Sequence, residues 1–327
     1  MIRVRAPAPP RVLAGLLAAL VAAVPCAGGA APVRVLYAGS LVGLFEDGLA
    51  PAFTRATGLQ VLGRPGGSVA LAHLIRDRLE RADVFVSADP GVNRLLRPSG
   101  SAPAAAWFLT LARSTVVIAY SPHSRFAAAL RDAAAGRVPW YRVLASPGLR
   151  VGRTDPALDP KGYRTVLVLK LAEAYYRRPG LLGRLLGDPA NPRQVFPEEE
   201  LVGRLASGQL DAGFFYLTEA LEQHLPYIAL PDAINLGNPA FARAYAQATY
   251  TDPAGVVHRG APILYTVTIS STARNPSGAV RFVQFLYSAS GRALLAAHGL
   301  LPVPPRVGGD ARAVPRPLRV LAASGPE

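Results

Sequence analysis

Residues 33–41 read Val-Arg-Val-Leu-Tyr-Ala-Gly-Ser-Leu, an apolar run that ends in an Ala-Gly-Ser turn. A second apolar run, Leu59–Leu62, precedes Gly66-Gly67-Ser68. At both turns a predicted strand gives way to a helical pattern. Glycine there lets the backbone approach a ligand closely, and the start of the next helix offers N–H groups and a partial positive charge. The two turns therefore predict a clamp for a small oxyanion, with Ser40 and Ser68 supplying hydroxyl groups.

Strands and helices alternate along the rest of the chain. The segment Asp83–Ser87 is predicted to be a strand that is apolar on both faces, as a central parallel strand is. Thr115–Tyr120 is a further strand, rich in β-branched residues. This alternation predicts the α/β class, with mainly parallel sheets flanked by helices.

The chain of 327 residues suits two lobes better than one. We expect it to cross between the lobes near Arg113–Tyr120 and again near Val257–Tyr265. The predicted division is residues 31–115 and 262–307 for lobe 1, 116–261 for lobe 2, and a disordered tail over 308–327, which is rich in Arg, Pro and Ala.

The first thirty residues have the layout of a secretory signal. Three arginines lead into the apolar run Val12–Val24, and small residues follow at 28–31. The apolar run is short for a membrane span. We expect cleavage after Ala30 and an exported protein at the periplasmic or extracellular side of the membrane; the alternative is an uncleaved anchor.

The only cysteine is Cys26. Lipid anchoring through it is an alternative, although Pro25 next to the cut makes a poor lipoprotein signal. If cleavage follows Ala30, the mature chain has no cysteine. Thiol catalysis and cysteine-based metal sites are then excluded.

The formal net charge is +14, with 35 Lys and Arg against 21 Asp and Glu. The arginines are scattered through helical patterns, with no helix-turn-helix signature and no basic stretch interleaved with aromatic residues. We therefore expect a solvated basic surface and no nucleic-acid partner.

Catalytic motifs are absent from the sequence. No two of its five histidines have a His-x-x-x-His or His-Glu-x-x-His spacing, no Gly-x-Ser-x-Gly elbow occurs, and no Walker lysine follows the glycine-rich turns. We expect neither an enzyme nor a bound cofactor nor a free metal ion. An exported enzyme that acts on a phosphate ester and a sensor module for a membrane partner stay as alternatives.

Five segments, in order and spacing, resemble the archaeal-type molybdate/tungstate-binding proteins of ABC importers. The resemblance runs from about Val33 to Pro304. It implies a two-lobed periplasmic-binding fold (type II) that closes on a hinge over a tetrahedral oxyanion, and a membrane permease as partner. We expect a monomer. The segments are Val35–Leu41, Gly66–Val69, Ala82–Asp89, Asp155–Arg164 and Tyr227–Leu236.

In that family the serines of the two turns hydrogen-bond the anion, and by motif match these are Ser40 and Ser68. The alternative for each is a helix N-cap that contacts no ligand. Ser87, in the Ser-Ala-Asp motif, is a candidate at the rim of the cleft; the alternative is a residue that only forms the turn at the end of the strand.

The Asp-Pro-x-Gly-Tyr-Arg motif supplies the second lobe's side of the site. The resemblance implies that Asp159 joins the coordination sphere of the oxyanion's metal; the alternative is a turn aspartate before Pro160. Tyr163 offers a hydroxyl at a helix start. For Arg164, the expectation is a solvated or ion-paired side chain.

The chain departs from the family at two positions. Alignment through Ser207–Phe214 places Phe215 where the family has a second carboxylate, and Lys161 replaces a cysteine. We therefore predict a tetrahedral anion held by hydrogen bonds and charge, with Lys161 either facing the cleft or solvated; Glu219 would have to replace the missing carboxylate in a six-coordinate site. The two changes also weaken the distinction between molybdate or tungstate and sulfate or another oxyanion.

Overall fold

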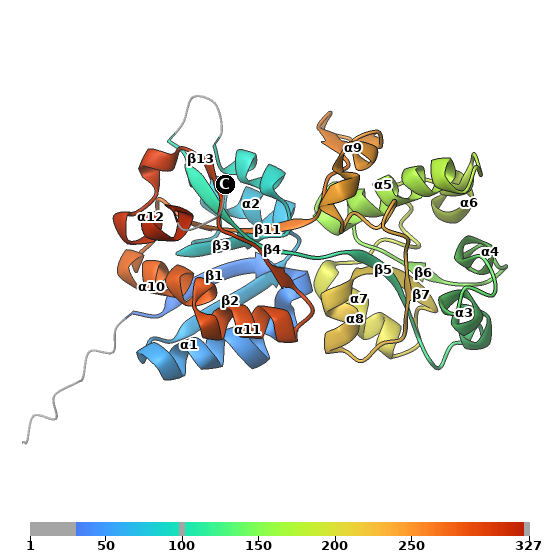
Figure 1. Ribbon diagram of the computed structural model, residues 1–327, viewed down its shortest axis with the longest axis horizontal. Helices are drawn as coiled ribbons and strands as arrows, with labels where there is room; N and C mark the ends of the chain where they lie inside the picture. Colours follow the sequence, from blue (N-terminus) through green and yellow to red (C-terminus); the bar gives the residue numbers. More distant parts are fainter. Residues whose placement is uncertain (1–30, 98–101, 324–327) are drawn as a thin grey trace, which may run out of the picture. The chain divides into compact units, whose positions relative to one another are not determined.

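The computed structural model describes residues 31–97 and 102–323, which build two mixed sheets flanked by helices (Figure 1). The predicted signal segment and Cys26 lie outside the described residues. The α/β class and the two-lobed fold are confirmed. We call the residues around the larger sheet the first lobe and the residues around the smaller sheet the second lobe.

The first lobe is built on a seven-stranded sheet of order β12-β4-β11-β3-β1-β2, in which β13 also pairs with β4. The strands are β1 Val33–Ala38, β2 Val61–Gly66, β3 Val84–Ser87, β4 Trp107–Arg113, β11 Leu264–Ile269, β12 Leu301–Pro302 and β13 Val307–Gly309. The helices are η1 Gly39–Leu41, η2 Leu44–Leu49, α1 Ala50–Thr57, α2 Ser68–Arg76, η3 Pro90–Leu96, α10 Pro276–Tyr287, α11 Ala289–Ala297, η5 Ala311–Ala313 and α12 Arg316–Ala323.

The second lobe is built on a four-stranded sheet of order β6-β7-β5-β8, beside the hairpin β9-β10. The strands are β5 Val116–Tyr120, β6 Val151–Gly152, β7 Ala212–Tyr216, β8 Tyr227–Ala229, β9 Thr249–Thr251 and β10 Val257–Arg259. The helices are α3 Ala127–Ala134, α4 Trp140–Leu144, α5 Pro160–Tyr175, α6 Leu181–Leu186, α7 Glu198–Ala206, α8 Leu217–Glu222, η4 Pro239–Phe241 and α9 Ala242–Tyr245.

The expectation of mainly parallel sheets is wrong. Only β1 with β2, β1 with β3 and β6 with β7 pair in parallel among the described strands. The chain leaves the first lobe at the end of β4 and returns at the start of β11, and these two strands pair with Leu264 opposite Arg113. A strand that enters a sheet where its neighbour leaves it must run antiparallel, so the passages between the lobes impose the mixed pattern.

The predicted disordered tail is also wrong over residues 308–323. Gly308 and Gly309 pair with β4, and α12 follows. Val314, just before α12, and Leu318, within it, are 1% and 0% exposed. The high Arg and Pro content of the segment concealed this apolar pair, which packs into the main core.

The first lobe brings three strand ends to one edge. Because β1, β2 and β3 run parallel, their carboxyl ends at Ala38, Gly66 and Ser87 lie at the same edge of the sheet. The chain then enters η1 and α2 directly. Both glycine-serine turns therefore face the same region of the molecule.

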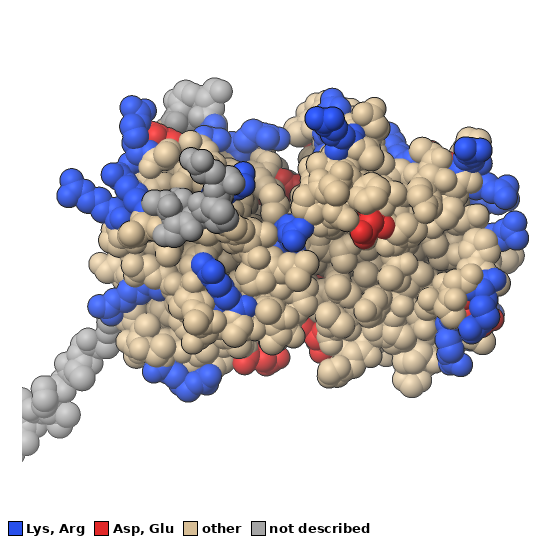
Figure 2. Space-filling model, in the orientation of Figure 1, with Lys and Arg blue, Asp and Glu red and all other residues tan. Residues whose placement is uncertain are grey.

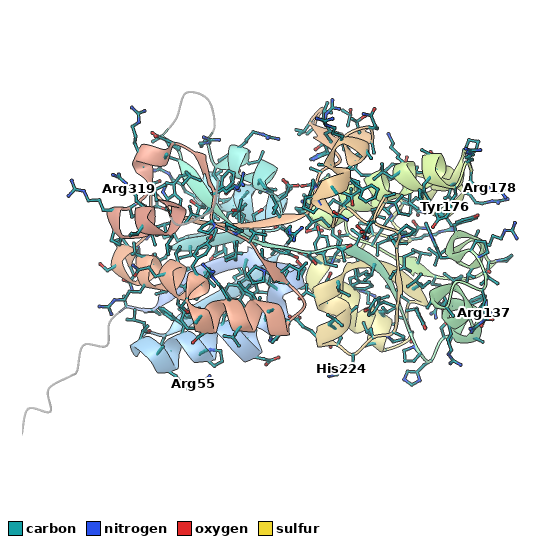
Figure 3. All side chains as sticks on the ribbon, viewed as in Figure 1. Arg55, Arg137, Tyr176, Arg178, His224 and Arg319 are labelled. Atoms are coloured by element: carbon teal, nitrogen blue, oxygen red, sulfur yellow. The ribbon has the colours of Figure 1, made fainter. Side chains whose placement is uncertain are left out.

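Basic side chains are distributed over the surface. Figure 2 shows Lys and Arg spread around the visible face, with fewer Asp and Glu between them. Arg55, Arg137 and Arg178 are exposed and project outward from separate helices and loops (Figure 3). Within the described part of the chain, no helix combines the length and the apolar character that crossing a membrane requires.

Candidate functional site

The first glycine-serine turn contributes a backbone donor and a hydroxyl. The Gly39 N–H donates to Oε2 of Glu198 at 2.8 Å, a contact between the two lobes. The Ser40 hydroxyl lies 3.0 Å from the Tyr265 hydroxyl and is 1% exposed. Ser40 lies inside η1, whose N-cap is Ala38, so its side chain does not cap a helix.

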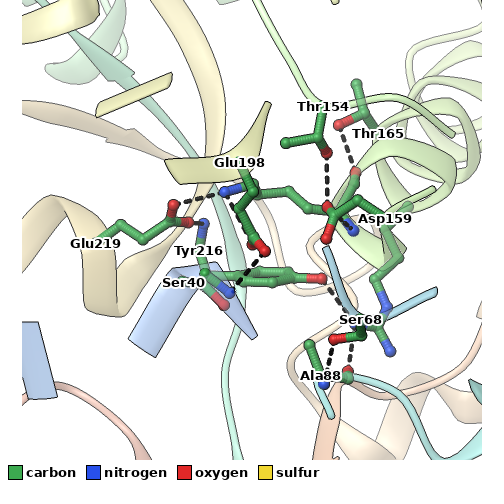
Figure 4. Close-up of polar contacts among 12 residues, drawn as sticks. Ser40, Ser68, Ala88, Thr154, Asp159, Thr165, Glu198, Tyr216 and Glu219 are labelled. Carbon is green, nitrogen blue, oxygen red and sulfur yellow. Dashed lines mark hydrogen bonds and ion pairs between the residues drawn. The ribbon is translucent and has the colours of Figure 1, made fainter. Parts of the chain in front are cut away.

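The second turn places Ser68 as the first residue of α2, with Gly67 as the N-cap. The Ser68 hydroxyl oxygen accepts the backbone N–H of Ala88 at 3.1 Å, and the residue is 0% exposed. Ser68 therefore links two strand ends of the first sheet (Figure 4). Because the Ser68 oxygen acts as the acceptor in this bond, its hydroxyl hydrogen stays available to donate to an anion.

Ser87 has a local role at the end of β3. Its hydroxyl donates to the carbonyl oxygen of Asp89 at 3.0 Å and accepts the Asp89 N–H at 3.1 Å. These bonds form a serine turn, which is the strand-end alternative foreseen for this residue.

Asp159 is the N-cap of α5. Its Oδ1 accepts the Lys161 N–H at 2.9 Å and the Thr154 hydroxyl at 2.7 Å (Figure 4). Its Oδ2 is buried and has no hydrogen-bond partner among the described residues. The carboxylate thus caps the start of α5 through Oδ1, as the turn alternative predicted, and its Oδ2 stays available as an acceptor.

Lys161 is completely buried, so the solvated alternative is wrong. Its Nζ lies 2.5 Å from Oε1 of Glu219 and 3.3 Å from Oε1 of Glu198. The Phe215 ring lies 5.4 Å from the ammonium and packs beside it. Lys161 is therefore held by the protein's own carboxylates rather than standing free to attract a ligand.

Burial raises the pKa of Glu198 well above its ordinary value, and the neighbouring Asp159 raises it further while Lys161 lowers it. Burial also raises the pKa of Glu219, against the lowering effect of Lys161. For Lys161 itself, burial lowers the pKa, but the attraction of the two glutamates outweighs this and raises it. We call Asp159, Lys161, Glu198 and Glu219 the buried charge cluster.

The premise that this site holds a single carboxylate is therefore wrong. Phe215 lies in β7, but Glu219, four residues further along in α8, and Glu198, from α7, both reach Lys161. Sequence reasoning missed Glu198. It is the first of three consecutive glutamates, and no local signal distinguishes it from its exposed neighbours Glu199 and Glu200.

Arg164 joins the two lobes. Its Nη1 donates to the Ala88 carbonyl oxygen at 2.6 Å and to the Tyr216 hydroxyl at 2.7 Å. Its Nη2 donates to Oδ2 of Asp89 at 2.7 Å. Arg164 is 3% exposed, so its side chain is ion-paired, as one alternative predicted, and not solvated.

Tyr163 packs away from this cluster. Its ring stacks on His258 with 4.0 Å between the ring centroids and 17° between the planes. Burial, followed by the nearby Asp89, raises the pKa of its hydroxyl well above the usual value. The hydroxyl is therefore a neutral donor at physiological pH.

A cavity of about 340 Å³ adjoins the buried charge cluster, and its lining includes Gly67, Thr154, Asp159 and Glu198. Oδ2 of Asp159 and Oε1 of Glu198 accept no hydrogen bond from the described residues, although Oε1 of Glu198 lies 3.3 Å from the Lys161 ammonium. Within the described ranges, no group of three or more His, Cys, Asp or Glu side chains is arranged to hold a metal ion. The ammonium of Lys161 lies among the carboxylates instead.

A family model for bacterial extracellular solute-binding proteins matches residues 33–301. A Haloferax volcanii protein, named as an ABC transporter molybdenum-binding protein, is 37% identical over 236 residues, 72% of each chain. The molybdate/tungstate-binding protein WtpA of Thermococcus kodakarensis is 32% identical over 285 residues, 79% of this chain and 78% of that one. Among solved structures, the periplasmic molybdate-binding protein of Azotobacter vinelandii has a TM-score of 0.58 at 22% identity, covering 82% of this chain and 98% of that one. The similarity to the Azotobacter protein supports the two-lobed fold of this chain.

Proposed function

Since the chain belongs to the family of bacterial extracellular solute-binding proteins, we propose that it captures molybdate or tungstate outside the cytoplasm for an ABC importer. Two relatives are named for molybdenum or for molybdate and tungstate, and each aligns with more than two thirds of this chain. The same relatives support a permease as the membrane partner.

The observation that carries the proposal is that both glycine-serine turns contact the second lobe, the first at the start of α7 and the second just before α5. Gly39 contacts the second lobe through Glu198, and the backbone N–H of Ala70, in the first turn of α2, donates to the Leu158 carbonyl oxygen at 3.1 Å. Backbone N–H groups, two buried serine hydroxyls and a helix start are the donors that a small oxyanion requires. The N–H groups and the serines belong to the first lobe, and the start of α5 belongs to the second.

This arrangement supports capture by hinge closure. Ser40 and Ser68 are buried where the lobes meet, so an anion reaches them only when the lobes separate. An anion that contacts both lobes stabilises the closed form in proportion to its extra contacts there. The closed form would then dock on the permease.

The carboxylates bear on the choice of anion. Each of them repels any dianion, and sulfate offers nothing in return, because its sulfur accepts no further oxygen ligand. The larger molybdenum and tungsten centres do accept further oxygen ligands. A tetrahedral bound anion stays a prediction, but the lack of a second carboxylate no longer supports it. X-ray absorption of the bound metal separates four equal short oxygen distances from four short and two longer ones.

Calorimetric titration of the purified protein with molybdate, tungstate, sulfate and phosphate at neutral pH tests the proposal. We expect tight binding of molybdate or tungstate and much weaker binding of phosphate, which is partly protonated at that pH. Tighter binding of phosphate than of molybdate would contradict the proposal. Turnover of a chromogenic phosphate ester would favour the enzyme alternative instead.

A further inference from the structure

The carboxylate of Glu198 accepts one donor that an oxyanion would use and lies beside a cation that would attract it. Its Oε2 accepts the Gly39 N–H of the Ala-Gly-Ser turn at 2.8 Å, and its Oε1 lies 3.3 Å from the Lys161 ammonium. The side chain is 0% exposed. A backbone N–H next to a glycine and a cationic group are the usual partners of a bound anion. Glu198 therefore occupies the backbone donor and pairs with the cation from within the chain (Figure 4).

The fit between Glu198 and Gly39 is close. A Cβ atom at position 39 would lie 2.9 Å from both Cγ and Oε2 of Glu198. The carboxylate thus rests against bare glycine backbone, where an approach this close depends on the missing side chain. An oxyanion oxygen that accepts the Gly39 N–H in line must occupy the position of Oε2, so both cannot be there together.

The surrounding charge makes this exclusion stronger. Asp159 and Glu219 contribute two more carboxylates to the buried charge cluster, where Lys161 is the ammonium that the described residues supply. When Glu198 is ionised, its charge adds to that of its neighbouring carboxylates and disfavours a dianion in this low-dielectric region. Neutralising Glu198 removes one of these charges, and moving its side chain away also frees the Gly39 N–H.

We propose that Glu198 is an internal competitor that sets the affinity of this site, because its carboxylate holds the Gly39 N–H and Lys161 until an oxyanion displaces it. The inference rests on the proposed function, since it concerns the same site. It assigns to α7 a role in ligand capture beyond its packing in the second lobe. Competition of this kind lowers the affinity for every oxyanion that uses the Gly39 N–H.

The test compares Glu198→Gln with Glu200→Gln by calorimetric titration with molybdate and tungstate. Glutamine keeps the length of the side chain and removes the charge, and one charged neighbour shifts an ionic equilibrium by about tenfold or more. We expect Glu198→Gln to bind about tenfold more tightly than the wild type. Glu200 is exposed in the same helical turn and does not line the cavity, so Glu200→Gln controls for net charge and should leave affinity unchanged.

A second variant tests displacement directly. Glu198→Ala leaves room for a small carboxylate, so added formate should compete with molybdate in this variant and weaken its binding. Formate should have no effect on the wild type, where the Glu198 carboxylate already occupies the position. A side chain that merely supports the fold would produce no such formate dependence.

Three further results of the titrations would decide between the inference and the proposed function. Unchanged or weaker molybdate binding by Glu198→Gln, with normal thermal unfolding, overturns the inference and leaves the proposed function standing. If the wild type binds none of the oxyanions but Glu198→Gln does, the competitor role is supported and the proposed function fails as stated. If neither protein binds any oxyanion, both are overturned.

Discussion

Replacing Lys161 by methionine removes the ammonium from the buried charge cluster and keeps most of the length of the side chain. In the native protein Nζ lies 2.5 Å from Oε1 of Glu219 and 3.3 Å from Oε1 of Glu198, with the Lys161 side chain 0% exposed. Lys170 is the other lysine of the chain and lies exposed on the same helix. Lys170→Met is therefore a matched control.

The loss of folding stability in Lys161→Met follows from these distances. At an effective dielectric constant of about 20, the two attractions amount to about 7 and about 5 kcal/mol. Desolvation of buried ions offsets several kcal/mol per ion, and removing one partner of a buried pair costs about 3–5 kcal/mol in practice. We expect the free energy of unfolding of Lys161→Met to fall by about 3–5 kcal/mol at pH 8.

The loss of stability in Lys161→Met should depend on pH. Burial already raises the pKa of Glu198 and of Glu219, and loss of the ammonium raises both further. A carboxyl group with a raised pKa in the folded state favours folding while it is protonated and disfavours it as the pH rises from the unfolded pKa to the folded pKa. The deficit of Lys161→Met should therefore be fully present at pH 8 and should shrink at pH 5.

Urea unfolding of the wild type, Lys161→Met and Lys170→Met, followed by circular dichroism at both pH values, measures these differences. Lys170→Met should stay close to the wild type. A Lys161→Met protein within about 1 kcal/mol of the wild type at pH 8, or with the same deficit at both pH values, would refute the reasoning, because three buried carboxylates could not then depend on this ammonium.

Three further predictions follow from single contacts. Ser40→Ala and Ser68→Ala should each weaken molybdate binding about tenfold to a hundredfold in calorimetric titration, since a hydrogen bond to a charged group contributes roughly 1.5–3 kcal/mol. Ser68→Ala should also lower the melting temperature, because it leaves a buried backbone N–H unpaired; unchanged affinity in both variants would reduce the serines to structural residues. Gly162→Ala should destabilise the protein by about 2 kcal/mol in urea unfolding, since its Cβ would lie 2.4 Å from backbone of the preceding loop, whereas Gly183→Ala, with nothing within 4 Å, should stabilise it slightly. Asp89→Asn should weaken molybdate binding about fivefold in the same titration, because a neutral acceptor holds the guanidinium that joins the lobes less strongly; equal affinity would argue against that contact in closure.

Local patterns predicted much of the fold. The apolar run at the start of β1, the helical spacing after it and the two glycine-serine turns were all visible in sequence, because each depends on residues a few positions apart. The helical pattern that follows the first turn is present as η2 followed by α1. The predicted strand Leu59–Leu62 is displaced to Val61–Gly66, a shift that propensity alone does not resolve.

The sequence by itself determined the α/β class, the two turns with their serines and the aspartate that starts α5, since glycine, serine and an Asp-Pro pair act on the backbone next to them. Only the tertiary structure decided which charges meet. Gly39 and Glu198 are 159 residues apart, and Lys161 and Glu219 are 58 apart. Such contacts depend on how helices of one lobe pack against strand ends of the other, and a row of three glutamates carries no mark of which one is turned inward.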